Sequence, residues 1–224
     1  MAEATGISPE ALLAGRQGES RAERKHWAIM EAAMTVFLRN GYLGTSMDEV
    51  AAQAGVSKQT VYKHFADKER LFHEIVLGTT DTIDALFRAV AADLGATEDL
   101  EADLGRFARR LMAALTEPEL LRLRRLIIAE ADRFPELGRT WYERGFERVL
   151  GSLATSLRRL DERGLLDVDD PALAAAHFAG LLLWIPVNRV MFRGGRERVE
   201  EAELERLADA GVRVFLAAYG RPAR

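Results

Sequence analysis

The segment from residue 41 to residue 65 constrains the fold more than any other, because it holds two short helical patterns on either side of one glycine. In the first, four apolar residues between Met47 and Ala54 recur at i, i+3, i+4 and i+7, the spacing of one buried helix face. Gly55 ends that pattern, and Ser57 is a natural N-cap for the second helix. We expect two short helices joined by a tight turn.

Flanking residues define the start and the end of this motif. Gly41 can adopt the left-handed conformation that ends a preceding helix over residues 22–40. Ser46 and Glu49 have the spacing of a capping box, which predicts the start of the first short helix. Asp67 can cap a longer helix directly after the second.

Helical spacing of apolar residues continues through the rest of the chain, and no long stretch alternates as a half-buried strand does. The sequence therefore predicts an all-α fold of about nine helices. We expect a mobile N-terminal tail (1–20), a helix-turn-helix domain (21–66) and a larger helical domain (67–224). The later helices are predicted near residues 98–115, 118–134, 135–163, 171–192 and 197–219.

Composition narrows the classes of function. The chain has no cysteine, which excludes disulfides, thiolate metal sites and a cysteine nucleophile, and agrees with a cytoplasmic location. The first twenty residues carry Glu3 and Glu10 and no apolar core, so we expect no secretory signal. His177, Pro186 and Arg189 interrupt the most apolar stretch, which predicts a buried helix and no membrane partner.

Charge is unevenly distributed along the chain. Residues 16–70 contain nine Lys and Arg against seven Asp and Glu, a net +2, which leaves −6 for the rest of a chain whose total is −4. The asymmetry is compatible with a local DNA-facing surface on an otherwise acidic protein.

The second short helix begins with a polar and basic turn, as insertion into a DNA groove requires. The N-terminal side chains of a recognition helix reach base edges in the major groove. Lys58 can donate to guanine, Gln59 can pair with adenine, and Thr60 can offer its methyl group or hydroxyl to a base. Phosphate contacts, which position a helix without specifying sequence, suit Tyr62, Lys63, His64 and Lys68. An alternative places Tyr62 and His64 as half-buried residues between helices.

The run NGYLGTSMDEVAAQAGVSKQTVYKHFADKERLF resembles the DNA-binding signature of the TetR family of transcription regulators. The resemblance implies a homodimer with a ligand-binding and dimerising C-terminal domain. It also implies phosphate contacts from Thr45, Ser46, Ser57, Tyr62, His64 and Lys68. The segments RRLIIAEADRFPEL and DVDDPALAAAHFAGLLLWIPVNRVMF are similar to the C-terminal domain of AefR-like members.

An effector pocket in the C-terminal domain is expected to be mainly apolar, and plain core packing is the alternative for each of its candidate residues. No metal site is expected, because His177 has no second ligand at i+3 or i+4. The candidate walls are Phe107, Leu111, Trp141, Phe146, His177, Trp184 and Asn188.

The two last helices are expected to form the dimer interface, because residues 171–192 are apolar nearly all round and one core covers only one side of a helix. The predicted interface residues are Leu181, Ile185, Leu204, Ala208, Gly211 and Phe215.

These features predict a ligand-responsive repressor that binds a palindromic operator as a homodimer. An activator or a ligand-independent repressor of the same fold is the alternative, and a helical protein-interaction module is a more distant one. The chain lacks a nucleophile elbow, a glycine-rich phosphate loop and an HExxH motif, so we expect no enzyme, no catalytic residues and no cofactor.

Overall fold

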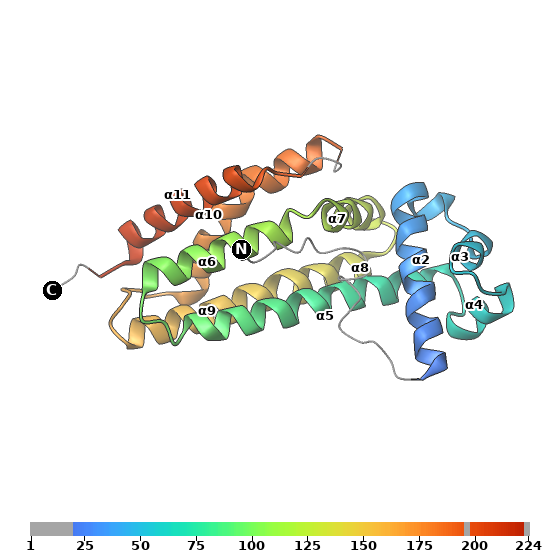
Figure 1. Cartoon of the computed structure of the whole chain (residues 1–224), viewed down its shortest axis with the longest axis horizontal. Coiled ribbons are helices and arrows are strands. Elements are labelled where there is room, and N and C mark those ends of the chain that lie inside the picture. The colour runs from blue at the N-terminus through green and yellow to red at the C-terminus, as the bar shows by residue number, and fades with distance from the viewer. Residues whose placement is uncertain (1–19, 195–197, 222–224) are drawn as a thin grey trace. The chain divides into compact units, whose positions relative to one another are not determined.

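The computed structural model describes residues 20–194 and 198–221, and every regular element within these ranges is a helix (Figure 1). The expected tail, apart from Ser20, lies outside the described residues. If α8, the following π-helix and α9 count as one, the described residues form nine helices, which confirms the predicted class. The elements are α2 (Arg21–Gly44), α3 (Met47–Gln53), α4 (Lys58–His64), α5 (Lys68–Leu94), α6 (Leu100–Leu115), α7 (Pro118–Glu130), α8 (Pro135–Thr140), the π-helix η2 (Trp141–Glu147), α9 (Arg148–Glu162), α10 (Pro171–Phe192) and α11 (Glu201–Tyr219).

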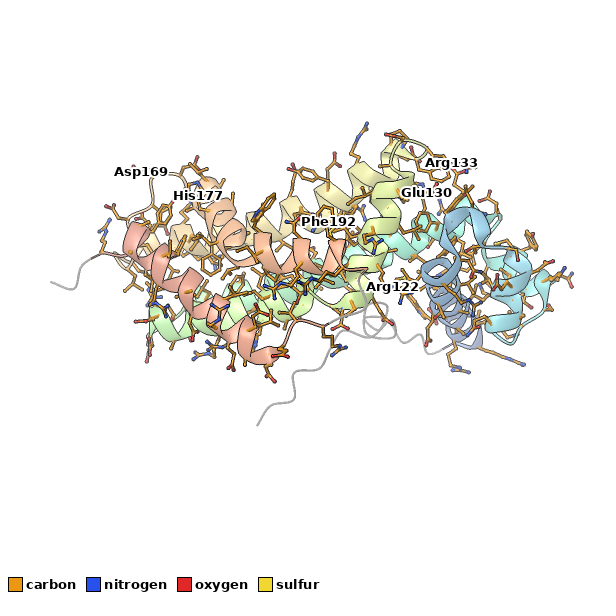
Figure 2. The ribbon with its side chains drawn as sticks, turned by 90° about the horizontal axis from the view of Figure 1, so that it is seen from above. Arg122, Glu130, Arg133, Asp169, His177 and Phe192 are labelled. Atoms are coloured by element: carbon orange, nitrogen blue, oxygen red, sulfur yellow. The ribbon has the colours of Figure 1, made fainter. Side chains whose placement is uncertain are left out.

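Contacts divide the described residues into two compact units. The helix-turn-helix unit comprises residues 20–83 and 122–145, and the bundle unit comprises residues 84–121, 146–194 and 198–221. The first unit is therefore larger than the segment 21–66 expected from sequence, because residues 122–145 pack against α2. The Arg122 guanidinium, labelled in Figure 2, donates to the Leu38 carbonyl at 2.8 Å. A functional boundary at residue 66 stays a prediction.

Side-chain caps and glycines define the short helices of the helix-turn-helix unit. The Ser46 hydroxyl accepts from the Glu49 amide, and the Ser57 hydroxyl accepts from the Thr60 amide, so both predicted N-caps are confirmed. Gly41 has φ 73° and Gly55 has φ 64°, the left-handed conformation that glycine adopts without steric cost. The capping box at Ser46 is only half formed, because the Glu49 carboxylate bonds Arg39 and Asn40 instead.

An aromatic cluster forms much of the core of this unit. The Phe37 and Phe72 ring centroids lie 4.9 Å apart, and the Tyr42 ring lies 5.3 Å from Phe72 and 4.8 Å from Phe134. All four side chains are buried. The cluster joins α2, α5 and the residue before α8, and so fixes the helices that support α3 and α4.

The bundle unit packs α10 against α9 and α11, and α11 also against α6, as Figure 1 shows. The rings of Phe178 on α10 and Phe215 on α11 meet edge to face with centroids 4.9 Å apart. Gly211 lets the two helices approach closely, since a Cβ added there would lie 2.6 Å from Leu182 Cδ2. Gly164, which ends the turn after α9, has φ 75°.

The predicted helix 135–163 is interrupted. Seven residues in its first half, Trp141–Glu147, form a π-helix, in which hydrogen bonds run from i to i+5. Such turns occur frequently at functional sites.

Helix α10 is long and apolar enough, by length and composition alone, to cross a membrane, although only 33% of its most apolar window is buried. The expectation of a buried helix is therefore half right. Phe178, Leu182 and Val187 face the core, whereas Trp184 is 72% exposed and Phe192 is 87% exposed.

Candidate nucleic-acid interface

The first turn of α4 presents three of the predicted DNA-contacting side chains to solvent. Ser57, Lys58 and Gln59 are exposed, and Thr60 is half-buried with its hydroxyl 2.9 Å from the Ser57 hydroxyl. One turn further on, Tyr62 and Lys63 are exposed on the same ridges as Lys58 and Gln59. The structure thus brings these polar side chains together on one face of a helix whose buried face is anchored by Val61.

Lys58, the strongest candidate for a base contact, has an ionic partner within the motif. Its ammonium pairs with the Asp48 carboxylate on α3, and both side chains are more than half exposed. Exposed pairs of this kind contribute about 0 to 1 kcal/mol, so a guanine acceptor can compete with Asp48. Asp48 was not predicted from sequence: it lies ten positions from Lys58 and approaches it because α3 and α4 contact each other.

Two predicted phosphate contacts, Thr45 and Lys68, have hydrogen-bond partners within the unit. The Thr45 side chain is buried, and its hydroxyl donates to the Gly41 carbonyl at 2.8 Å. The Lys68 ammonium donates to the Tyr42 carbonyl at 2.8 Å and the Thr45 carbonyl at 2.9 Å, and it lies 4.6 Å from the centre of the Tyr42 ring. Lys68 therefore stabilises the C-terminal end of α2.

Burial and neighbouring charges shift the pKa values of this region. Burial lowers the pKa of Lys68, and the nearby Arg133 lowers it further. Burial also raises the pKa of Tyr42, and the Glu69 carboxylate raises it further. The lowered pKa of Lys68 agrees with an ammonium group that donates hydrogen bonds within the helix-turn-helix unit.

His64 lies at the C-terminal end of α4. Its imidazole is half-buried, with its centroid 5.9 Å from that of His26 on α2 and 6.4 Å from that of Phe65. Burial lowers the pKa of His26, which stacks on Phe65 at 4.8 Å. Ser46, the other predicted phosphate contact, is exposed and caps α3.

The predicted effector-pocket residues differ in their burial, and one of them lies in the other unit. Phe107 and Leu111 are core residues, with the Phe107 ring 6.0 Å from Phe178. His177 and Trp184 are exposed instead of enclosed, and the His177 Nδ1 lies 2.6 Å from the Tyr219 hydroxyl. Phe146 and Asn188 are half-buried in this unit, while Trp141 belongs to the helix-turn-helix unit.

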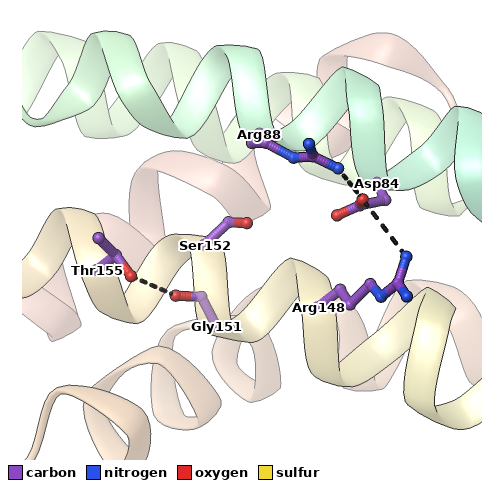
Figure 3. A pocket seen from close by; sticks show the side chains of 6 residues that line it. All are labelled: Asp84, Arg88, Arg148, Gly151, Ser152 and Thr155. Atoms are coloured by element: carbon purple, nitrogen blue, oxygen red, sulfur yellow. Dashed lines mark hydrogen bonds and ion pairs between the residues drawn. The ribbon is translucent and has the colours of Figure 1, made fainter.

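A hollow of about 330 Å³ opens between α5 and α9 in the bundle unit (Figure 3). The Arg88 and Arg148 guanidinium groups both approach the Asp84 carboxylate there. None of the predicted wall residues lines it. Its lining is Asp84, Arg88, Arg148, Gly151, Ser152 and Thr155.

The predicted dimer-interface residues fall into two groups. Leu181 and Ile185 on α10 are exposed, and Leu204 on α11 is half-buried. Ala208, Gly211 and Phe215 are buried within the same chain, where small and aromatic side chains on α11 pack α11 onto α6 and α10.

The regular elements of the described residues are all helices, with a capped helix-turn-helix in one unit and a helical bundle in the other. These features place the protein in the class of helix-turn-helix proteins with an additional C-terminal domain. Residues 29–75 match the family model described as bacterial regulatory proteins of the TetR family, and residues 102–221 match that of the AefR-like transcriptional repressor C-terminal domain. The chain belongs to the TetR family.

Individual relatives agree with this assignment. A structure from Mesorhizobium loti MAFF303099, described as a TetR-family regulator, is 53% identical, with a TM-score of 0.85 over 91% of this chain and 100% of that one. The flavonoid-responsive regulator FrrA is 32% identical, with a TM-score of 0.66 over 89% and 99% of the two chains. A DNA-binding transcriptional repressor TetR from Mycobacteroides abscessus is 34% identical over 46% of this chain, which spans only 54% of that relative.

Proposed function

We propose that this protein is a transcriptional repressor that binds a palindromic operator through α4. The observation that carries the proposal is the side-chain-capped α4, whose first turn exposes Lys58 and Gln59 while Val61 anchors its opposite face. Base contacts come from Lys58, Gln59 and Thr60, and phosphate contacts come from Ser46, Ser57, Tyr62, Lys63 and His64. The N-terminal end of α4 adds a positive dipole and free amides, which favour approach to phosphate.

Selection of bound sequences from random duplexes by the purified chain tests this function. We expect a palindromic consensus whose affinity exceeds that of a scrambled duplex by about 10³-fold or more. The affinity should fall steeply as salt rises, because phosphate contacts release counterions. Enrichment of no sequence, or equal affinity for consensus and scrambled duplexes, would refute a sequence-specific regulator and would favour a protein-interaction module.

The second part of the proposal is a homodimer formed through an exposed apolar stripe on α10. The stripe repeats at helical spacing along the whole helix, on which His177 and Phe192 are labelled near opposite ends in Figure 2. Aromatic and aliphatic side chains beside polar ones are typical of the centre of a protein interface. The stripe residues are Leu173, Leu181, Trp184, Ile185 and Phe192.

A second copy of the chain explains this stripe better than a membrane does. A spanning helix needs lipid or protein around its full circumference, whereas α10 packs one face on α9 and α11 and carries Asn188 and Arg189 in its second half. A palindromic operator also requires two recognition helices about 34 Å apart, which one chain does not supply. Membership of the TetR family supports the same arrangement.

The third part of the proposal is release from DNA by a small, mainly apolar effector that contacts Trp141. The indole Nε1 of Trp141 is buried in the π-helix and has no hydrogen-bond partner among the described residues. An unpaired buried donor costs about 1 to 3 kcal/mol, which an acceptor on a ligand would offset. Since the similar regulator FrrA is named flavonoid-responsive, flavonoids are the first probes to use.

Substitution Trp141→Phe tests the effector contact, because it retains an aromatic ring and removes the N–H donor. We expect a flavonoid that releases the native protein from its operator to act at least about 10-fold less effectively on the variant. Operator affinity without the flavonoid should be unchanged. An unaltered response would remove Trp141 from the effector site, and no response in the native protein to any probe would favour a ligand-independent repressor.

A further inference from the structure

We propose that Glu69, His73 and Glu136 form a binding site for a divalent transition-metal ion, with Zn²⁺ as the best match. One donor atom from each residue lies within 4.8 Å of the other two. All three residues belong to the helix-turn-helix unit. This site differs from the DNA-contacting surface, from Trp141 and from the α10 stripe, and the proposal departs from the sequence-based expectation of no metal site.

The three donors lie on two helices, α5 and α8. Glu69 and His73 are at i and i+4 on α5, so their side chains lie on one face of the helix. Glu136 lies in the first turn of α8, which is anchored by buried Phe134 and Leu137 on either side of it. A site on helices keeps its donors in place more firmly than one on loops.

The distances agree with coordination of a small ion. Two ligands of a tetrahedral Zn²⁺ ion, each bound at about 2.1 Å, are about 3.4 Å apart. The His73 Nε2 lies 3.4 Å from the Glu136 Oε1. Glu69 is exposed and can complete the set by a side-chain rotation, and a fourth position stays open to water.

The donor set favours a transition metal over magnesium or calcium. One neutral imidazole and two carboxylates supply a nitrogen ligand and two negative charges, which balance a divalent ion. Magnesium and calcium prefer oxygen ligands only. The simpler alternative is an ion pair between protonated His73 and Glu136, for which Glu69 has no role.

The other described histidines lack this environment. His177 lies against the Tyr219 hydroxyl, and His26 lies between Phe65 and His64. Among the residues that the structure describes, Glu69, His73 and Glu136 are the one group of three potential ligands with this spacing.

A bound ion would join α8 to the first turns of α5. Helix α5 begins four positions after the last residue of α4. An ion that binds only the folded protein stabilises it by mass action. Zinc should therefore raise the melting temperature of the full chain. Because this readout needs no DNA, failure of the metal site and failure of the DNA-binding proposal are distinguishable.

Calorimetric titration of the untagged, chelator-treated full chain with Zn²⁺ tests the proposal. We expect one ion per chain and a loss of about 10-fold or more in affinity for each of Glu69→Gln, His73→Ala and Glu136→Gln. The controls His177→Ala and Glu101→Gln alter an exposed histidine and an exposed glutamate elsewhere, and they should bind as the native protein does. Mg²⁺ should produce no comparable heat.

Thermal unfolding of the same proteins gives a second readout. Zn²⁺ should raise the melting temperature of the native chain and of both controls but not that of the site variants. All variants are expected to fold, because Glu69 and Glu136 are exposed and His73 is only half-buried. Absence of Zn²⁺ binding, or native affinity in Glu69→Gln or Glu136→Gln, would overturn the site and leave the His73–Glu136 ion pair as the explanation.

Discussion

The α3–α4 region and the α10–α11 region are both helical pairs, but their sequences specify them in different ways. Each short helix of the first pair starts at a serine whose hydroxyl accepts a backbone amide, and a left-handed glycine separates the two. In the second pair, α10 is apolar on both faces, and contacts distant in sequence decide which face is buried.

The two regions differ in which residues determine their structure: neighbours in sequence for α3–α4, and contacts distant in sequence for α10–α11. Residues within four positions of each other define the ends of α3 and α4, so their geometry persists without a partner. The exposed stripe on α10 has no such local explanation, since five large apolar side chains on a solvent-facing surface need something to cover them. We therefore expect substitutions in the two regions to change different properties of the protein.

The largest effect is expected from Trp184→Glu on the exposed stripe, because the charge would enter the centre of the interface twice in a two-fold contact. The variant should become monomeric and lose about 100-fold or more in operator affinity, since one half-site lacks the effective-concentration gain of two linked heads. Sedimentation and DNA titration measure both quantities. Ile128→Glu, an exposed apolar residue on α7, is the control and should stay dimeric. A dimeric Trp184→Glu protein would place the interface elsewhere.

A smaller effect, on folding alone, is expected from Gly211→Ala. The new Cβ would lie 2.6 Å from Leu182 Cδ2 in a buried contact, and overpacking of this kind costs about 1 to 3 kcal/mol. Chemical denaturation measures the free energy of unfolding. Gly151→Ala on α9 has open space around its Cβ and should be neutral or stabilising. Equal effects at the two glycines would show that Gly211 is not a core contact.

Ser57→Ala tests the local definition of α4. Loss of the hydroxyl that accepts the Thr60 amide should lower the free energy of unfolding by about 1 kcal/mol. Ser57→Asn retains a capping acceptor and should be nearly as stable as the native protein. If the alanine and asparagine variants unfold at the same denaturant concentration, the Ser57 cap does not contribute to stability. The claim that local caps define α4 would then be wrong.

The smallest effect is a dependence of stability on pH through His26. Burial lowers the pKa of His26, and His64 lowers it further, while Glu74 opposes them. A histidine whose folded pKa is lowered stabilises the protein fully above its unfolded pKa of about 6.5, and that stability is lost as the pH falls from there through the folded pKa. Melting temperatures should therefore fall less steeply with acidification in His26→Phe, which retains a ring against Phe65. An unchanged profile would assign the acid sensitivity to other groups.

Local signals predicted the helix ends, whereas long-range pairings were missed. Ser46, Ser57, Gly41 and Gly55 were identified from sequence because each acts on residues within a few positions. The contact of the Lys68 ammonium with the Tyr42 carbonyl joins positions 26 apart and has no periodic pattern.

The same limit applies to the bundle unit and to the surroundings of His73. The burial of Gly211 depends on Leu182, and the approach of Glu136 to His73 joins positions 63 apart in the chain. Apolar spacing shows that a helix has a buried face but does not tell whether that face meets the same chain or a partner. Ala208 and Phe215 were for this reason assigned to an interface, although they lie in the core.

The specificity ratio of Lys58→Ala measures most directly whether the first turn of α4 contacts bases. Titration of a selected operator and a scrambled duplex should show a loss of about 10-fold to 100-fold on the operator and little change on the scrambled DNA. Lys63→Ala, which removes a proposed phosphate contact one turn further on, should weaken both complexes by similar factors. Equal losses of Lys58→Ala on the two duplexes would contradict the account.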